Sequence, residues 1–176
     1  MRSSYKILDN QYPYFITSTI LEWIPIFTNS KYCDILTSAL KFYQTNKNLK
    51  IFSFVTMDNH FHLIAVNENL SRIMSNFKKY TAKQIINNIK KDSKDWLLHQ
   101  FEFYKKAHKT ESEYQVWQEG FHPIQISSQE MFNQKAEYIH YNPVRRGLVE
   151  NPEDWKYSSA SHYLKDKQCV IDIDSF

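Results

Sequence analysis

Glycine and cysteine are scarce in this sequence, and each shortage excludes a class of site. Only Gly120 and Gly147 occur among 176 residues, which excludes the glycine-rich loops that hold nucleotide phosphates. Cys33 and Cys169 lie far apart in the chain, so they indicate neither a disulfide framework nor a cysteine zinc site and fit a reducing cytoplasm. No apolar run reaches the roughly eighteen residues of a membrane span, and a signal-peptide pattern is missing at the N-terminus. We therefore expect a cytoplasmic protein.

The residues that are abundant indicate a folded domain with a weakly basic surface. Apolar residues make up 42% of the chain and charged residues 23%, which is enough apolar material for one core at this length. The net charge of +3 permits phosphate-bearing partners without demanding them. Aromatic residues reach 16%; such rings can stack on unpaired bases, although most of them are expected in the core. We expect one domain over residues 1–176, with about 127–176 as a C-terminal extension.

Hydrophobic periodicity predicts an alternation of strands and helices. The predicted strands cover residues 12–21, 49–56 and 60–66, and the predicted helices cover residues 30–46 and 70–91. Turn residues at 57–59 join the second and third strands in a hairpin. The order β, α, β, β, α predicts an α+β fold in which helices cover an antiparallel sheet of ferredoxin-like character.

The second half of the chain gives weaker patterns. A helix is predicted at 94–109, and short strands are predicted at 114–118 and 122–126. The pattern from residue 128 to residue 141 predicts a further helix. We expect that helix to stop before Asn142-Pro143, because the residue preceding a proline disfavours the helical conformation.

A pair of histidines marks the predicted strand at 60–66. In His60-Phe61-His62 the two imidazoles point to one face of the strand, because side chains alternate along it, and Phe61 points to the other. Two imidazoles on one face can chelate a metal ion. A His-x-His pair alone is more often structural, so this motif needs further support.

The predicted helix at 70–91 carries a tyrosine and an amide four residues apart. Tyr80 and Gln84 are therefore neighbours on one side of the helix. They border the apolar stripe that would pack on the sheet, and a polar flank containing Arg72, Lys79 and Lys83 adjoins them. Taken alone, these residues would be read as an aromatic at a helix border and as ordinary solvated side chains.

Several ordered segments resemble a known family. MDNHFHLI, followed by LSRIMSNFKKYTAKQI, resembles the HUH transposases with a single catalytic tyrosine, especially the REP-associated tyrosine transposases. VWQEGFHPIQI at 116–126 and YIHYNPVRRGLVENPEDWKYSS at 138–159 are similar to later segments of the same group. The resemblance covers about residues 12–163.

The resemblance implies an HUH endonuclease fold and a metal-dependent reaction on DNA. It implies His60 and His62 as metal ligands, Tyr80 as the nucleophile and Gln84 as a third ligand, with Mg²⁺ or Mn²⁺ as the metal. The enzyme would nick and rejoin hairpin-containing single-stranded DNA through a 5′-phosphotyrosine, and we would expect it at the nucleoid. One departure is Asp58, which stands where such sequences commonly have proline.

Other residues and other functions stay open at this point. Arg145 and Arg146 form a compact basic turn that either holds a phosphate or is merely solvated, and we leave His122 outside the catalytic set. The alternative functions are a non-catalytic regulator that binds hairpin DNA and a metal phosphodiesterase in which water is the nucleophile. The sequence fits either a monomer or a homodimer.

Overall fold

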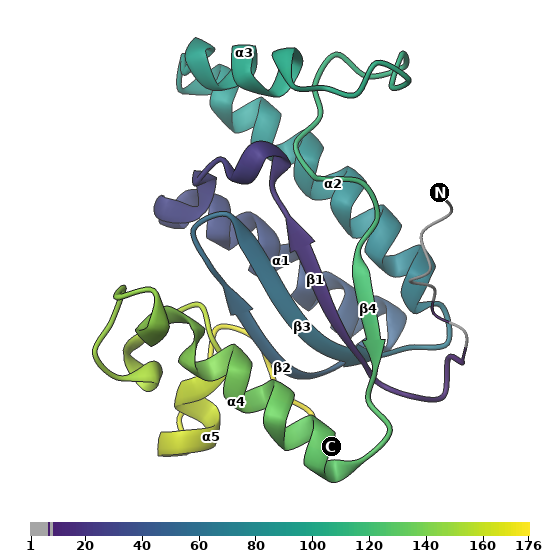
Figure 1. Ribbon diagram of the computed structural model, residues 1–176, viewed down its shortest axis with the longest axis vertical. Helices are drawn as coiled ribbons and strands as arrows, with labels where there is room; N and C mark the ends of the chain where they lie inside the picture. The colour runs from purple at the N-terminus through teal and green to yellow at the C-terminus, as the bar shows by residue number, and fades with distance from the viewer. Residues whose placement is uncertain (1–6, 8) are drawn as a thin grey trace.

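The computed structural model describes residue 7 and residues 9–176, and it is organised around one antiparallel sheet (Figure 1). The sheet has four strands in the order β2-β3-β1-β4. The strands and helices are β1 (Tyr14–Thr19), α1 (Ser30–Lys47), β2 (Lys50–Thr56), β3 (His60–Val66), α2 (Leu70–Lys91), α3 (Asp95–Phe103), β4 (His122–Gln125), α4 (Gln129–Arg145) and α5 (Ala160–Lys165). The predicted α+β class, with helices on an antiparallel sheet, is confirmed. None of the described helices is both long and apolar enough to cross a membrane.

Strand alternation divides the sheet into two faces that bind different helices. On one face, residues such as Phe61 and Leu63 join the core formed with α1 and α2, and the ring of Phe61 lies 5.3 Å from the ring of Phe77 on α2. On the other face, Phe15 and Ile64 join a second core with α4. We call these the α2 face and the α4 face. Each large apolar side chain buried on either face contributes roughly 1.5–3 kcal/mol relative to an exposed one.

Helix α4 continues beyond the predicted stop at Asn142-Pro143 and ends at Arg145, so that boundary was wrong. Proline lacks one N–H, which removes a single helical hydrogen bond, but its own carbonyl still accepts a hydrogen bond from Leu148. Two residues after the helix ends, Gly147 has a φ of +68°, the left-handed conformation typical of the residue that follows a helix C-terminus. The extra turn carries Asn142 and Arg145 on the helix.

Two other elements are shorter than their predictions. Helix α3 ends at Phe103 rather than near residue 109, because its buried apolar residues stop at Phe101 while Phe103 is 79% exposed. The predicted strand at 114–118 forms only an isolated bridge between Trp117 and Ile20. Residues 104–121 therefore form a long irregular segment that lies against α2.

Candidate active site

The two histidines of β3 lie on the α4 face, at the floor of an open cavity of about 400 Å³. The strand register pairs His62 with Thr17 and His60 with Thr19 across the β1–β3 ladder. The two imidazole centroids are 4.8 Å apart. The cavity is lined by Thr17, Thr19, Trp23, Asn59, His60, His62, Tyr138, Asn142 and Arg146. The predicted sharing of one face by the two imidazoles is confirmed.

Hydrogen bonds hold both rings in fixed orientations. The Thr17 Oγ1 lies 2.8 Å from Nδ1 of His62, and Asn59 Oδ1 lies 2.7 Å from Nδ1 of His60. Phe15 stacks on the His62 ring with a centroid distance of 5.2 Å. Nε2 of His62 is buried and has no hydrogen-bond partner among the described residues. A buried nitrogen without a hydrogen-bond partner destabilises the fold unless a ligand binds to it. The imidazole nitrogens of His60 and His62 therefore fit a metal ion.

The electrostatics keep the imidazoles neutral at physiological pH. Burial, followed by the smaller effects of the nearby His60 and Lys135, lowers the pKa of His62 to about 3. Burial also lowers the pKa of His60, and Arg146 acts in the same direction, while the Asp58 carboxylate opposes them. Neutral imidazole is the form that binds metals, so both rings are ready to coordinate without first losing a proton.

Helix α4 contributes a tyrosine and an amide to this cavity. Tyr138 and Asn142 are four residues apart on α4 and both line the cavity. The Tyr138 ring lies 5.3 Å from the His62 ring, and the side chain remains 41% exposed. Among the described residues, no three His, Cys, Asp or Glu side chains cluster in a way that could hold a metal. A metal here would therefore use the two imidazoles and the amide oxygen of Asn142.

Tyr80 and Gln84 lie elsewhere, and the prediction that they share a site with the histidines is wrong. Both residues are on α2, which packs on the face of the sheet that carries Phe61. His60 and His62 are on the opposite face, where α4 packs. The sheet therefore separates Tyr80 and Gln84 from the two histidines within the chain.

The basic residues predicted to bind DNA divide between the two faces. On the α4 face, Arg146 lines the cavity and forms an ion pair with Asp58 at 3.1 Å, while the Arg145 guanidinium lies 5.4 Å from the ring centre of Tyr138. Asp58, the departure from the family pattern, thus anchors the segment that follows Asn142-Pro143. Arg72, Lys79 and Lys83 are exposed on α2, away from this cavity.

An exposed tryptophan stands at the rim of the cavity in an unusual backbone conformation. Trp23 is 61% exposed, and both it and Glu22 have positive φ, at 53° and 50°. Such conformations cost a non-glycine residue roughly 1–3 kcal/mol and gather at functional sites. The Trp23 carbonyl accepts a hydrogen bond from Asn59 Nδ2 at 3.1 Å. The same asparagine that orients His60 therefore also holds the strained turn.

Two groups at this site were overlooked in the sequence. Tyr138 and Asn142 lie in the segment YIHYNPVRR, which belongs to the family resemblance, and they repeat the i, i+4 spacing of Tyr80 and Gln84. His122 lies on the same face of the sheet, opposite Thr17 in the β1–β4 ladder, but does not line the cavity.

Comparisons with known proteins agree with the family resemblance. No known protein-family profile matches the chain. A curated protein of Haemophilus influenzae, named as a REP-associated tyrosine transposase, is 38% identical over 50 residues, a stretch that spans only 28% of either chain. A solved REP-associated tyrosine transposase bound to a REP hairpin superposes with a TM-score of 0.67 at 17% identity, covering 100% of this chain and 95% of the other.

A second solved structure, described as a transposase from Deinococcus radiodurans, gives a TM-score of 0.47 at 14% identity over 79% of this chain and 92% of the other. The solved REP-associated structure supports the fold and the curated protein supports a shared segment of sequence. The recognition of this chain as similar to the REP-associated tyrosine transposases is therefore confirmed.

Proposed function

We propose that this protein is a metal-dependent enzyme that cuts and rejoins hairpin-containing single-stranded DNA, with Tyr138 as the nucleophile. The observation that carries the proposal is the meeting of Tyr138, Asn142, His60 and His62 in one cavity. The similarity to a transposase whose solved structure holds a REP hairpin supports DNA of this kind as the substrate. Tyr138 thus takes the role that the sequence resemblance gave to Tyr80, and Asn142 takes the role of Gln84.

The reaction conserves the energy of the phosphodiester bond. The phenol oxygen of Tyr138 forms a bond to the scissile phosphorus while the bond between phosphorus and the 3′ oxygen breaks. The phenol loses its proton to solvent and the released 3′ oxygen takes up a proton, which leaves the DNA joined through its 5′ phosphate to Tyr138. Attack by a 3′ hydroxyl on this linkage reverses the step and rejoins a strand, so no nucleotide cofactor is needed.

The cavity supplies groups that would hold the reacting phosphate. A divalent ion, Mg²⁺ or Mn²⁺, held by His60, His62 and Asn142 would bind a phosphate oxygen and stabilise the charge that develops at phosphorus. Arg145 lies against the Tyr138 ring, and Lys135 precedes Tyr138 by one turn of α4 with its ammonium 5.2 Å from the ring centre of Phe15. These two cations flank the nucleophile and would attract the DNA backbone.

Trp23 would position a base beside the cleavage point. Its indole is largely exposed at the cavity rim, and stacking of a base on an aromatic ring stabilises single-strand binding by roughly 1–3 kcal/mol. The strained turn that holds this ring outward is therefore consistent with a binding role.

The test is covalent capture of DNA. The protein is incubated with Mn²⁺ and labelled hairpin DNA libraries that carry single-stranded flanks, separated by denaturing electrophoresis, and digested for peptide mass spectrometry. We expect a DNA adduct on the α4 peptide at Tyr138, and we expect Tyr138→Phe to abolish it while DNA binding persists. A hairpin-binding regulator would form no adduct, and a phosphodiesterase that uses water would cleave without one.

Two matched variants make this result specific. Tyr141→Phe changes a tyrosine that lies one turn along the same helix with nearly the same exposure, 40% against 41% for Tyr138, but does not line the cavity. Tyr80→Phe removes the hydroxyl first predicted from sequence. Both variants should form the adduct at the parent's rate. Retention of the adduct in Tyr138→Phe, or its loss in Tyr80→Phe, would overturn the assignment.

A further inference from the structure

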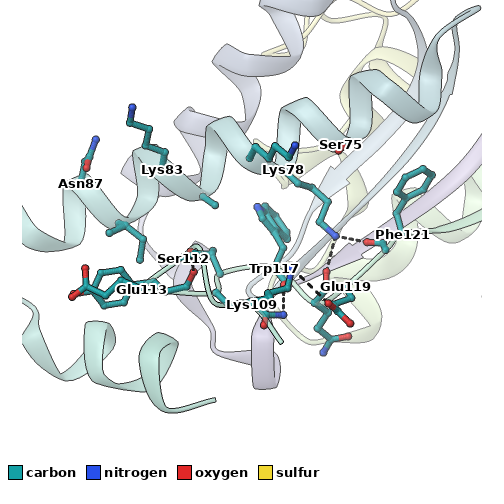
Figure 2. Close-up of a pocket in the computed structure, with 18 residues that line it drawn as sticks. Ser75, Lys78, Lys83, Asn87, Lys109, Ser112, Glu113, Trp117, Glu119 and Phe121 are labelled. Atoms are coloured by element: carbon teal, nitrogen blue, oxygen red, sulfur yellow. Dashed lines mark hydrogen bonds and ion pairs between the residues drawn. The ribbon is translucent and has the colours of Figure 1, made fainter. Parts of the chain in front are cut away.

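A second hollow lies on the α2 side of the molecule, away from the candidate active site. It is a groove of about 570 Å³ between α2 and the irregular segment at 104–121 (Figure 2). One wall is α2 and the other includes residues 112–121. Lys78 ties the walls together, because its ammonium donates hydrogen bonds to the backbone carbonyls of Gln118 and Gly120. The groove is thus a built feature of the fold.

The α2 wall presents a regular row of hydrogen-bond donors. Ser75, Lys79, Lys83 and Asn87 line the groove and are all exposed. They recur at every fourth residue, so successive members rise about 6 Å along the helix axis. Each of these side chains can donate a hydrogen bond, and two carry a positive charge. Such a row suits a ligand with repeated anionic groups.

The ion pairs around the groove leave Lys79 and Lys83 available to bind an anionic ligand. On the opposite wall, Glu119 is paired with His108 and Lys109, and Glu113 is paired with Lys90. Within the part of the chain that the structure describes, neither Lys79 nor Lys83 has a carboxylate within ion-pair distance. Lysine ammonium groups therefore partly offset the charges of the two carboxylates that would repel an anion.

Aromatic and aliphatic side chains also line the groove. Tyr114 and Phe121, both partly exposed, lie across the groove from the donor row together with the buried Trp117. Proteins that bind single-stranded nucleic acid commonly combine these two features. Their cations contact the phosphates, and the bases stack on their aromatic rings. A duplex cannot place its bases in such a groove because they are stacked and paired inside the helix.

The groove is continuous in sequence with the edge of the candidate active site. Gly120 and Phe121 line the groove, and the next residue, His122, begins β4 opposite Thr17 on the α4 face. Because β4 is the last strand in the sheet order, the groove and the α4 face adjoin the same edge of the sheet (Figure 1).

We propose that this groove binds the unpaired DNA strand that flanks the hairpin, with phosphates along Lys79 and Lys83 and bases against Tyr114 and Phe121. This proposal rests on the proposed function, because it assigns a second subsite to the same DNA. The groove provides affinity for the flank, whereas the cavity at Tyr138 provides the chemistry.

The test compares two DNAs and two double variants. Lys79→Gln/Lys83→Gln removes the two groove charges, and Lys41→Gln/Lys47→Gln removes two exposed charges from α1. We expect the groove variant to weaken binding of a flanked hairpin by roughly threefold to thirtyfold and to reduce the salt slope by about 1.4, with little change for a blunt hairpin. The α1 variant should bind both DNAs like the parent.

Cross-linking provides a readout that does not depend on substitution. A flank containing 4-thiothymidine should cross-link on irradiation to peptides of α2 and of residues 112–121 in the parent protein. Equal affinity of the groove variant for flanked hairpin, or cross-links confined to other segments, would overturn the proposal. With saturating DNA the groove variant should still form the Tyr138 adduct. A missing adduct in the parent would instead refute the proposed function.

Discussion

The hydrogen bond between Thr17 and His62 offers a sharp test of the metal assignment. Metal binding through the buried Nε2 of His62 requires the ring proton on Nδ1, which then donates to Thr17 Oγ1 at 2.8 Å. Thr17→Val keeps the shape and β-branching of the side chain but removes this acceptor. The imidazole then loses the partner that fixes its tautomer and orientation.

The expected effect is tenfold to a hundredfold weaker metal binding, which is typical when an outer hydrogen bond to a ligating histidine is lost. This corresponds to about 1.4–2.7 kcal/mol. At a metal concentration about 100 times the parent's Kd, bound metal should stabilise the parent by about 2.7 kcal/mol. In a chain of this size each kcal/mol shifts the Tm by roughly 2–4 °C. The parent's metal-induced shift of about 5–10 °C should fall by half or more in the variant.

Thr19→Val is the matched control. Thr19 lies two residues along β1 on the same face, opposite His60. Nδ1 of His60, however, forms its hydrogen bond with Asn59. Thermal melts and calorimetric titration with Mn²⁺ should therefore find the parent's affinity in Thr19→Val and a reduced affinity in Thr17→Val. Equal affinities in the two variants would refute the idea that Thr17 prepares His62 for a metal.

Two further predictions concern the DNA and the buried polar core. Trp23→Ala should weaken binding of single-stranded DNA by about 1–3 kcal/mol in competition assays while Trp23→Phe retains most of it, and equal loss in both would contradict a stacking role. Burial lowers the pKa of His140 to about 4, whereas the histidine of the unfolded chain has a pKa of about 6.5. Between about pH 6.5 and pH 4 the unfolded chain therefore binds one more proton than the folded chain. The free energy of unfolding should fall by up to about 3 kcal/mol as the pH drops through this window. Urea melts should show that the free energy of unfolding of His140→Gln depends less on pH than that of the parent. The same pH dependence in both proteins would assign the acid sensitivity to other groups.

The elements with strong periodicity were predictable from the sequence. Helix α2 begins at Leu70 and ends at Lys91 as its apolar repeat predicts, and the hairpin of β2 and β3 follows from alternation and the turn between them. Around Pro143 the local rule failed, because a proline near a helix end removes only one hydrogen bond while tertiary packing keeps the last turn helical. Local propensity therefore located the elements better than it located their ends.

Placing the nucleophile required knowledge of which helix covers which face of the sheet. Alternation along β3 already puts Phe61 and Leu63 on one face and the two histidines on the other. The apolar stripe of α2, which contains Phe77, must pack against an apolar face, and the Phe61 face is the one that it buries. A helix packed there cannot bring its tyrosine to His62, so Tyr80 is excluded by the same strand periodicity that groups the histidines. The helix on the histidine face is therefore the one from which we propose the nucleophile, and it brings Tyr138 and Asn142, four residues apart, to the cavity beside the histidines.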